Sequence, residues 1–328
     1  MTNFGGFLQS NLRFQISNIF VSVITILFCS GQAFAAPAVQ EKIPSCRIYR
    51  IMARAYMAYG QFDKAMPLAE KALALARQPR PVGAPNEELA NCLGDLAYIY
   101  NSLDRFTDAR QLCELTIALQ KKTYYDRHPF VAYSLRTLAS IQQGQGNFAE
   151  AEESLRQAID IMLDSHPADD CVMAPFHVDF AKLLVAEGNL TEAEQYYDKA
   201  IKQINQTFGP DHLYSATVLG NLAQLYILQD RYSEAEPLIN KSQAIQEKFY
   251  GPENHLIAAL WLAKAKICLA KGNADEADTL IQKARSAIQK TGNTKELARL
   301  EQKITRLRQP KPETASLPIT PRPDNAST

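Results

Sequence analysis

The sequence predicts an all-α fold in which six helix–turn–helix units stack on one another and one further helix follows the last unit. Three observations lead to this prediction. A turn position recurs at near-fixed intervals, two alanines keep a constant distance from it, and a Gly or Asp stands two residues before it. A period of this length is typical of stacked helical hairpins, because each hairpin buries its apolar face against its neighbours.

The turn position sets the repeat length. An aromatic residue or its replacement occupies it at intervals of 44, 42, 42, 42 and 42 residues: Phe62, Phe106, Phe148, Leu190, Tyr232 and Ala274. The residues two places earlier tolerate a positive φ, as the end of a helix often requires. They are Gly60, Asp104, Gly146, Gly188, Asp230 and Gly272. Hydroxyl and acidic residues just after the turn, such as Thr107 and Ser233, predict side-chain caps at the start of each second helix.

Two small residues in every unit predict where its two helices cross. Alanine stands nine residues before the turn position and three residues after it in all six copies. The first set is Ala53, Ala97, Ala139, Ala181, Ala223 and Ala265; the second is Ala65, Ala109, Ala151, Ala193, Ala235 and Ala277. A methyl side chain lets two helices approach closely, whereas a larger one would force them apart.

The ends of the chain differ from the array, which we expect to cover residues 45–292. Residues 1–35 have the pattern of a cleaved signal peptide: an apolar core at Ile19–Cys29 and a small-x-small site before Ala36. The core is too short for a membrane anchor, which needs about 20 apolar residues. We therefore expect the protein to be exported, and to be periplasmic or secreted if its host is bacterial.

The C-terminal end is predicted to be a capping helix and a tail. Residues 294–308 place Leu297, Leu300, Ile304 and Leu307 on one helical stripe, which can cover the last repeat. Residues 309–328 are rich in proline and poor in apolar residues, which predicts disorder.

The pattern resembles the tetratricopeptide repeat (TPR), in the 42-residue form found in kinesin light chains. The segment Leu135–Ile159 and the segment Leu219–Leu238 carry the resemblance, together with the links His128-Pro129 and Gly209-Pro210-Asp211-His212. The resemblance implies a right-handed α-solenoid whose first helices line a concave groove. The repeat array itself predicts a scaffold that binds a segment of another protein.

The first three repeats carry the candidate binding residues. Arg47, Arg50 and Arg54 lie within about 60° of one another on a helix, and we expect them to face the groove. The opposite face, with Ile48, Met52 and Tyr56, is expected to point into the core. Asn91, Tyr98, Asn101, Tyr133 and Arg136 occupy the same face in the next two repeats. Guanidinium groups bind carboxylates, and Tyr and Arg often anchor interfaces. The predicted ligand is an anionic peptide or a free C-terminal carboxylate, although Asp95 on the same face weakens this prediction. Lys182, Asn221, Gln224 and Lys266 are the weaker counterparts in the C-terminal half.

Other functions have less support in the sequence. We found no HExxH, GxSxG or Walker pattern, so we expect no enzymatic activity, cofactor or metal. Lys+Arg and Asp+Glu are equal at 35 each, and the groove positions vary in chemistry, so we expect no nucleic-acid partner. The alternative to groove binding is self-association through the repeat ends or through the terminal helix and tail.

The cysteines do not form a disulfide pattern. After signal cleavage Cys46, Cys92, Cys113, Cys171 and Cys268 remain, scattered and without a CxxC pair. We interpret them as small core residues, with Cys46–Cys92 as the pairing to test first.

Overall fold

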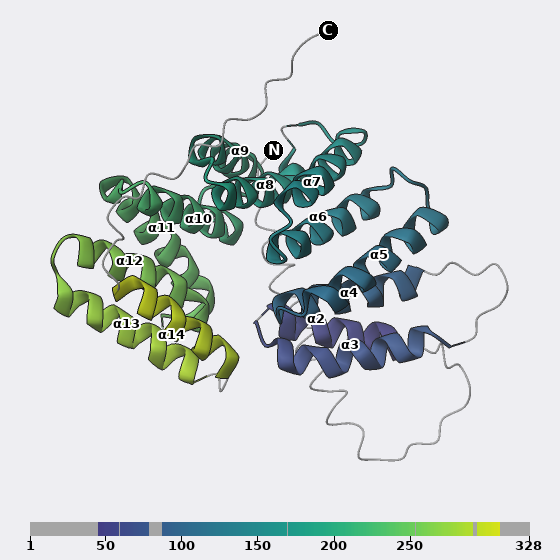
Figure 1. The fold of residues 1–328 in the computed structure, drawn as a ribbon, viewed down its shortest axis with the longest axis horizontal. Coiled ribbons are helices and arrows are strands. Elements are labelled where there is room, and N and C mark those ends of the chain that lie inside the picture. The colour runs from purple at the N-terminus through teal and green to yellow at the C-terminus, as the bar shows by residue number, and fades with distance from the viewer. Residues whose placement is uncertain are drawn as a thin grey trace, which may run out of the picture. The chain divides into compact units, whose positions relative to one another are not determined.

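The computed structural model describes residues 45–58, 60–78, 87–168, 170–252, 254–290 and 294–308 (Figure 1). The predicted signal peptide and the predicted disordered tail lie outside these residues. Within the described ranges the chain forms helices and no strand. None of these helices is long and apolar enough to cross a membrane.

Successive helices pack as six hairpins, in the order in which they occur along the chain (Figure 1). The pairs are α2 (Ser45–Ala58) with α3 (Phe62–Ala76), α4 (Glu87–Ser102) with α5 (Phe106–Thr123), α6 (Pro129–Gly144) with α7 (Phe148–Leu163), α8 (Ala174–Glu187) with α9 (Leu190–Phe208), α10 (Leu213–Leu228) with α11 (Tyr232–Tyr250), and α12 (Ala258–Ala270) with α13 (Ala274–Gln289). Short 3-10 turns, η1 (Cys171–Met173) and η2 (His255–Ile257), precede α8 and α12. The predicted fold class is confirmed: the protein is an all-α solenoid of six hairpin repeats.

The twelve recurring alanines lie where their spacing predicts. Each of them is at most 1% exposed. Because no side chain larger than a methyl group stands at these positions, the two helices of each hairpin can pack at short distance. Larger residues such as Leu96 and Leu222 fill the space beside the crossings.

The six turns also follow the prediction. All six residues two places before the turn position have positive φ, from 60° at Asp104 and Asp230 to 84° at Gly188. A residue with a Cβ pays a steric cost in this region, which Asp tolerates better than most. The two Asp turns are therefore the strained members of the series.

The predicted hydroxyl caps are wrong, whereas the predicted carboxylates do lie in the first turns of the second helices, as with Asp108 and Glu234. The residues that precede the second helices, such as Arg105 and Arg231, make no side-chain capping hydrogen bond. Thr107 and Ser233 lie inside the first helical turn, one residue beyond its start. Instead, Arg105 and Arg231 bind the first-turn carboxylates of Asp108 and Glu234, and these carboxylates lie where the helix dipole favours negative charge.

Helix α14 (Thr294–Arg308) covers the last hairpin, as expected of a capping helix. Leu300 and Ile304 are 4% and 3% exposed, and Leu297 and Leu307 pack against the same core. Arg285 of α13 donates to both carboxylate oxygens of Glu301, at 2.6 and 2.9 Å.

The five cysteines within the described residues are free thiols. Cys46, Cys92, Cys113 and Cys268 are buried, in agreement with a packing role. Burial raises the pKa of the Cys92 and Cys113 thiols to about 12, so both stay protonated at neutral pH.

Candidate functional site

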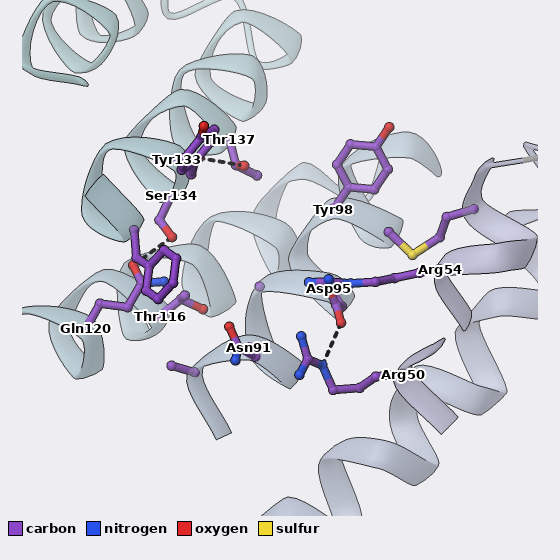
Figure 2. A pocket seen from close by; sticks show the side chains of 14 residues that line it. Arg50, Arg54, Asn91, Asp95, Tyr98, Thr116, Gln120, Tyr133, Ser134 and Thr137 are labelled. Atoms are coloured by element: carbon purple, nitrogen blue, oxygen red, sulfur yellow. Dashed lines mark hydrogen bonds and ion pairs between the residues drawn. The ribbon is translucent and has the colours of Figure 1, made fainter. Parts of the chain in front are cut away.

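A pocket of about 620 Å³ opens between the first helices of the first three repeats (Figure 2). We call it the α4 pocket. It is lined by Arg50, Arg54 and Met57 of α2, by Ala90, Asn91, Gly94, Asp95 and Tyr98 of α4, by Thr116 and Gln120 of α5, and by Phe130, Tyr133, Ser134 and Thr137 of α6. Its walls therefore combine aromatic rings with hydroxyl, amide and charged groups.

The floor of the α4 pocket comes from a second helix, α5. Gly94 has no side chain to cover this floor, and a Cβ built on it would lie 3.6 Å from the methyl group of Thr116. Below it, the Ser134 hydroxyl donates to Gln120 Oε1 at 2.8 Å. Both side chains are largely buried, so the floor is a fixed polar surface.

A buried ion-pair network forms the α2 side of the pocket. Arg50 donates through Nε to Asp95 Oδ2 at 2.9 Å, and Arg54 Nε donates to Asp95 Oδ1 at 2.9 Å (Figure 2). Arg50 also donates through Nη1 to Glu88 Oε2 at 3.0 Å. Arg50 and Asp95 are only 8% and 6% exposed. Burial opposes the charge on Arg50, but the attraction and hydrogen bonding of Asp95 outweigh it, and the pKa of Arg50 is raised.

The three arginines differ in what they offer a ligand. The Arg50 side chain is 10% exposed and bound on two sides, whereas the Arg54 and Arg47 side chains are 57% and 63% exposed. A guanidinium group has five N–H donors, so Arg54 can hold Asp95 and still donate to a group in the pocket mouth. Arg47 binds Glu88 at 3.3 Å outside the pocket.

The structure brings five of the eight predicted site residues to this pocket: Arg50, Arg54, Asn91, Tyr98 and Tyr133. Arg47, Asn101 and Arg136 are not among its lining residues. Asn101 donates to Ser140 Oγ at 3.0 Å. Arg136 pairs with Asp179 at 3.4 Å, and its guanidinium carbon lies 5.6 Å from the centre of the Tyr133 ring.

The predicted orientation of α2 needs one correction. We expected Arg50 on an open face and Ile48 in the core, but Ile48 is 38% exposed and Arg50 is buried. The reason is that Asp95 and Glu88 of the next repeat neutralise Arg50, so its burial leaves no isolated charge.

The floor of the pocket was not predicted, although the sequence carries a signal for it. Thr116 and Gln120 occupy positions where most second helices carry Ala followed by Ala, Met or Ile: Ala72 and Ala76, Ala158 and Met162, Ala200 and Ile204, Ala284 and Ile288. Polar residues in the apolar stripe of a helix indicate a hydrogen-bonded partner or a ligand.

Three of the five histidines have structural roles. His128 and His212 cap α6 and α10, where the ring Nδ1 of each accepts from the backbone N–H two residues later. His177 is buried, with Nδ1 2.9 Å from Gln203 Oε1, and burial lowers its pKa. Across the described part of the chain, no three His, Cys, Asp or Glu side chains gather as a metal site would require.

Repeated helical hairpins with crossing alanines, and a groove lined by their first helices, define a tetratricopeptide repeat protein. Comparison with known families agrees: residues 46–251 match the MalT-like TPR region, and residues 221–290 match a tetratricopeptide repeat family. The chain belongs to the MalT-like TPR family. A comparison with curated proteins gave no match.

Several solved structures are similar. The putative kinesin light chain repeat protein of Podosopora anserina is 25% identical, with 63% of this chain and 98% of that chain covered and a TM-score of 0.46. The Rap conjugation gene regulator of plasmid pLS20 is 13% identical, with coverage of 85% and 81% and a TM-score of 0.62. A Rap protein complexed with competence and sporulation factor is also 13% identical, with coverage of 80% and 74% and a TM-score of 0.57. The two Rap proteins share the fold with this chain.

Proposed function

We propose that this protein is a non-enzymatic scaffold that binds a peptide segment of a partner protein in the α4 pocket. One observation carries the proposal: an open pocket of about 620 Å³ combines exposed aromatic rings with Arg54. The Arg54 side chain is about half exposed, and Asp95 holds its guanidinium group in place. Aromatic and arginine side chains are the commonest anchors of protein interfaces.

The charge of the network favours an anionic group on the ligand. Three arginines, Arg47, Arg50 and Arg54, face two carboxylates, Glu88 and Asp95, which leaves one positive charge in excess. Asp95 fixes the Arg54 guanidinium group, so little side-chain freedom is lost when a ligand binds. A side-chain carboxylate or a free C-terminus would then accept from Arg54, with the Asn91 amide beside it.

Related structures support a peptide as the ligand class. The Rap regulator of pLS20 was solved with the Phr* peptide, and another Rap protein with competence and sporulation factor. Both have the fold of this chain, and the Phr* complex supports a peptide as a ligand that a protein of this fold can bind.

The test is peptide selection. The full chain would be used to select binders from a random-peptide display library, and their affinity would be measured with Arg54→Ala. We expect a loss of about tenfold or more, because hydrogen bonds to a charged group contribute about 1.5–3 kcal/mol. Arg127→Ala is the matched control, since Arg127 is also about half exposed and binds Asp160 and Asp164 away from the pocket. The proposal would be overturned if the library yields no peptide, or if the selected peptides bind the Arg54→Ala variant as tightly as the unchanged protein.

Two further measurements complete this test. The mass in solution should stay that of a monomer, whereas self-association would give a larger species that disappears when residues 294–328 are deleted. Export forms the second part of the proposal, and it rests on the signal pattern of residues 1–35. N-terminal sequencing of the mature protein should begin at Ala36, and a mature chain that starts at Met1 would contradict it.

A further inference from the structure

A second pocket lies three repeats further along the groove. It has a volume of about 430 Å³ and opens between α10, α11 and the start of α12. We call it the α10 pocket. Its lining includes Gly220, Asn221, Gln224 and Gln246, with apolar side chains such as Leu256 and Leu260. None of its lining residues is charged, in contrast to the α4 pocket.

The two pockets are built at the same repeat positions. Gly220, Asn221, Gln224 and Gln246 are the counterparts of Gly94, Asp95, Tyr98 and Gln120, each three repeats of 42 residues further on. The other four repeats carry Arg50, Arg136, Val178 and Leu262 at the Gly position and apolar residues at the Gln position. Of the six repeats, only the two that form these pockets combine a glycine in the first helix with a buried glutamine in the second helix.

The α10 pocket contains a hydrogen-bond donor without an acceptor. Asn221 Nδ2 is buried and has no partner among the described residues. Its counterpart Asp95 accepts from Arg50 and Arg54, but the corresponding residues beside Asn221 are Val178 and Lys182. Lys182 binds Asp179 instead, at 3.1 Å. A buried donor without a partner costs free energy, and a ligand that supplies an acceptor recovers it.

Both pockets lie beside the end of α2. Met57 lines the α4 pocket, and the next residue, Ala58, lines the α10 pocket. Gly60 in the following turn agrees with this placement, because a Cβ built on it would lie 3.9 Å from His255 Nε2 at the start of the sixth repeat. One ligand can therefore reach the two pockets without following the groove through all the repeats between them.

We propose that the α10 pocket is a second subsite, which takes a neutral segment of the same peptide. A carbonyl oxygen of the peptide, from its backbone or from an Asn or Gln side chain, accepts from Asn221 Nδ2. An uncharged side chain packs against Leu256 and Leu260. This inference rests on the proposed function. It divides the ligand into an anionic end at Arg54 and a neutral, amide-bearing part at Asn221.

The experiment uses the peptides selected on the full chain and adds variants of the α10 pocket. Asn221→Leu keeps the size of the side chain and removes the donor, so the affinity should fall by about tenfold, the equivalent of one hydrogen bond. Thr217→Tyr adds a ring at an exposed lining position and should weaken binding without disturbing the core. Gln243→Leu is the control: it also removes an amide with an unpartnered buried atom, but Gln243 does not line the pocket.

The outcomes separate the two proposals. Peptides weakened by Arg54→Ala but unaffected by Asn221→Leu and Thr217→Tyr would overturn the second subsite and leave the proposed function standing. Peptides weakened by the Asn221 and Thr217 variants but not by Arg54→Ala would overturn the proposed function and the division of one peptide between two pockets, because binding would then depend on the α10 pocket alone. Failure to select any peptide overturns both. Losses in all three variants, with Gln243→Leu unchanged, support both.

Discussion

The α4 and α10 pockets share one frame but differ in charge. Each has a glycine that leaves the groove wall open, a small hydroxyl residue below it and a buried glutamine in the second helix. At the position after the glycine, one has Asp95 with two arginines and the other has Asn221 with none. The repeat therefore fixes where a pocket can form, and a few groove residues decide what it binds.

The two pockets also differ in how their polar groups are satisfied before a ligand arrives. In the α4 pocket, Asp95 accepts from Arg50 and Arg54, and Gln120 accepts from Ser134. In the α10 pocket, Gln246 donates to Ser242, but the Asn221 donor is left over. The polar groups of the α4 pocket are thus already held in place before a ligand binds. In the α10 pocket, the unpartnered Asn221 donor lowers the stability of the free protein, and a ligand that accepts from it would remove this loss.

The largest effect should follow from breaking the α4 network. Asp95→Leu removes the acceptor of Arg50 and leaves a buried guanidinium group with Glu88 alone. Removing one partner of a buried ion pair is strongly destabilising, and we expect a loss of about 3 kcal/mol in the free energy of unfolding. Urea denaturation at neutral pH measures it. A loss no larger than that of Arg127→Ala would show that Arg50 is not buried as described.

The alanine crossings should respond alike in both regions, because they belong to the common frame. Ala97→Leu and Ala223→Leu each insert three carbon atoms at a site that is 0% exposed. Overpacking of this kind costs about 1–3 kcal/mol, and the two losses should agree within the error of a denaturation curve. A large difference between them would mean that the two repeats do not have the same helix crossing.

These comparisons show what the sequence could predict. Periodicity alone placed the hairpins, the twelve alanines and the six positive-φ turns, because each depends on residues close in sequence. It also placed the candidate site residues on one face of the first helices, and the structure brings five of these eight residues to one pocket. It could not predict that Arg50 is buried, because that depends on Glu88 and Asp95 meeting it from the next repeat. The pocket floor was missed because Thr116 and Gln120 lie on a second helix, which was not expected to reach the groove.

A smaller effect of opposite sign should follow from changing the counterpart of Asp95. Asn221→Leu removes a buried donor that has no partner among the described residues and adds apolar surface to a pocket that Leu256 and Leu260 also line. We expect a gain of about 1 kcal/mol in the free energy of unfolding of the unliganded protein. The same denaturation series measures it. A loss instead would indicate that the Asn221 amide already has a partner in the free protein.

The smallest effect distinguishes how open the two pockets are. Alanine stabilises a helix interior relative to glycine by about 0.5–1 kcal/mol, provided that its Cβ has room. At Gly94 the new Cβ would lie 3.6 Å from the nearest Thr116 carbon, an ordinary contact, so Gly94→Ala should show most of this gain. At Gly220 it would lie 3.2 Å from Leu260 Cδ2, which must move, so Gly220→Ala should be close to neutral. Equal gains in the free energy of unfolding would mean that the Leu260 side chain moves at little energetic cost. The α10 pocket would then be able to adjust its shape when a ligand binds.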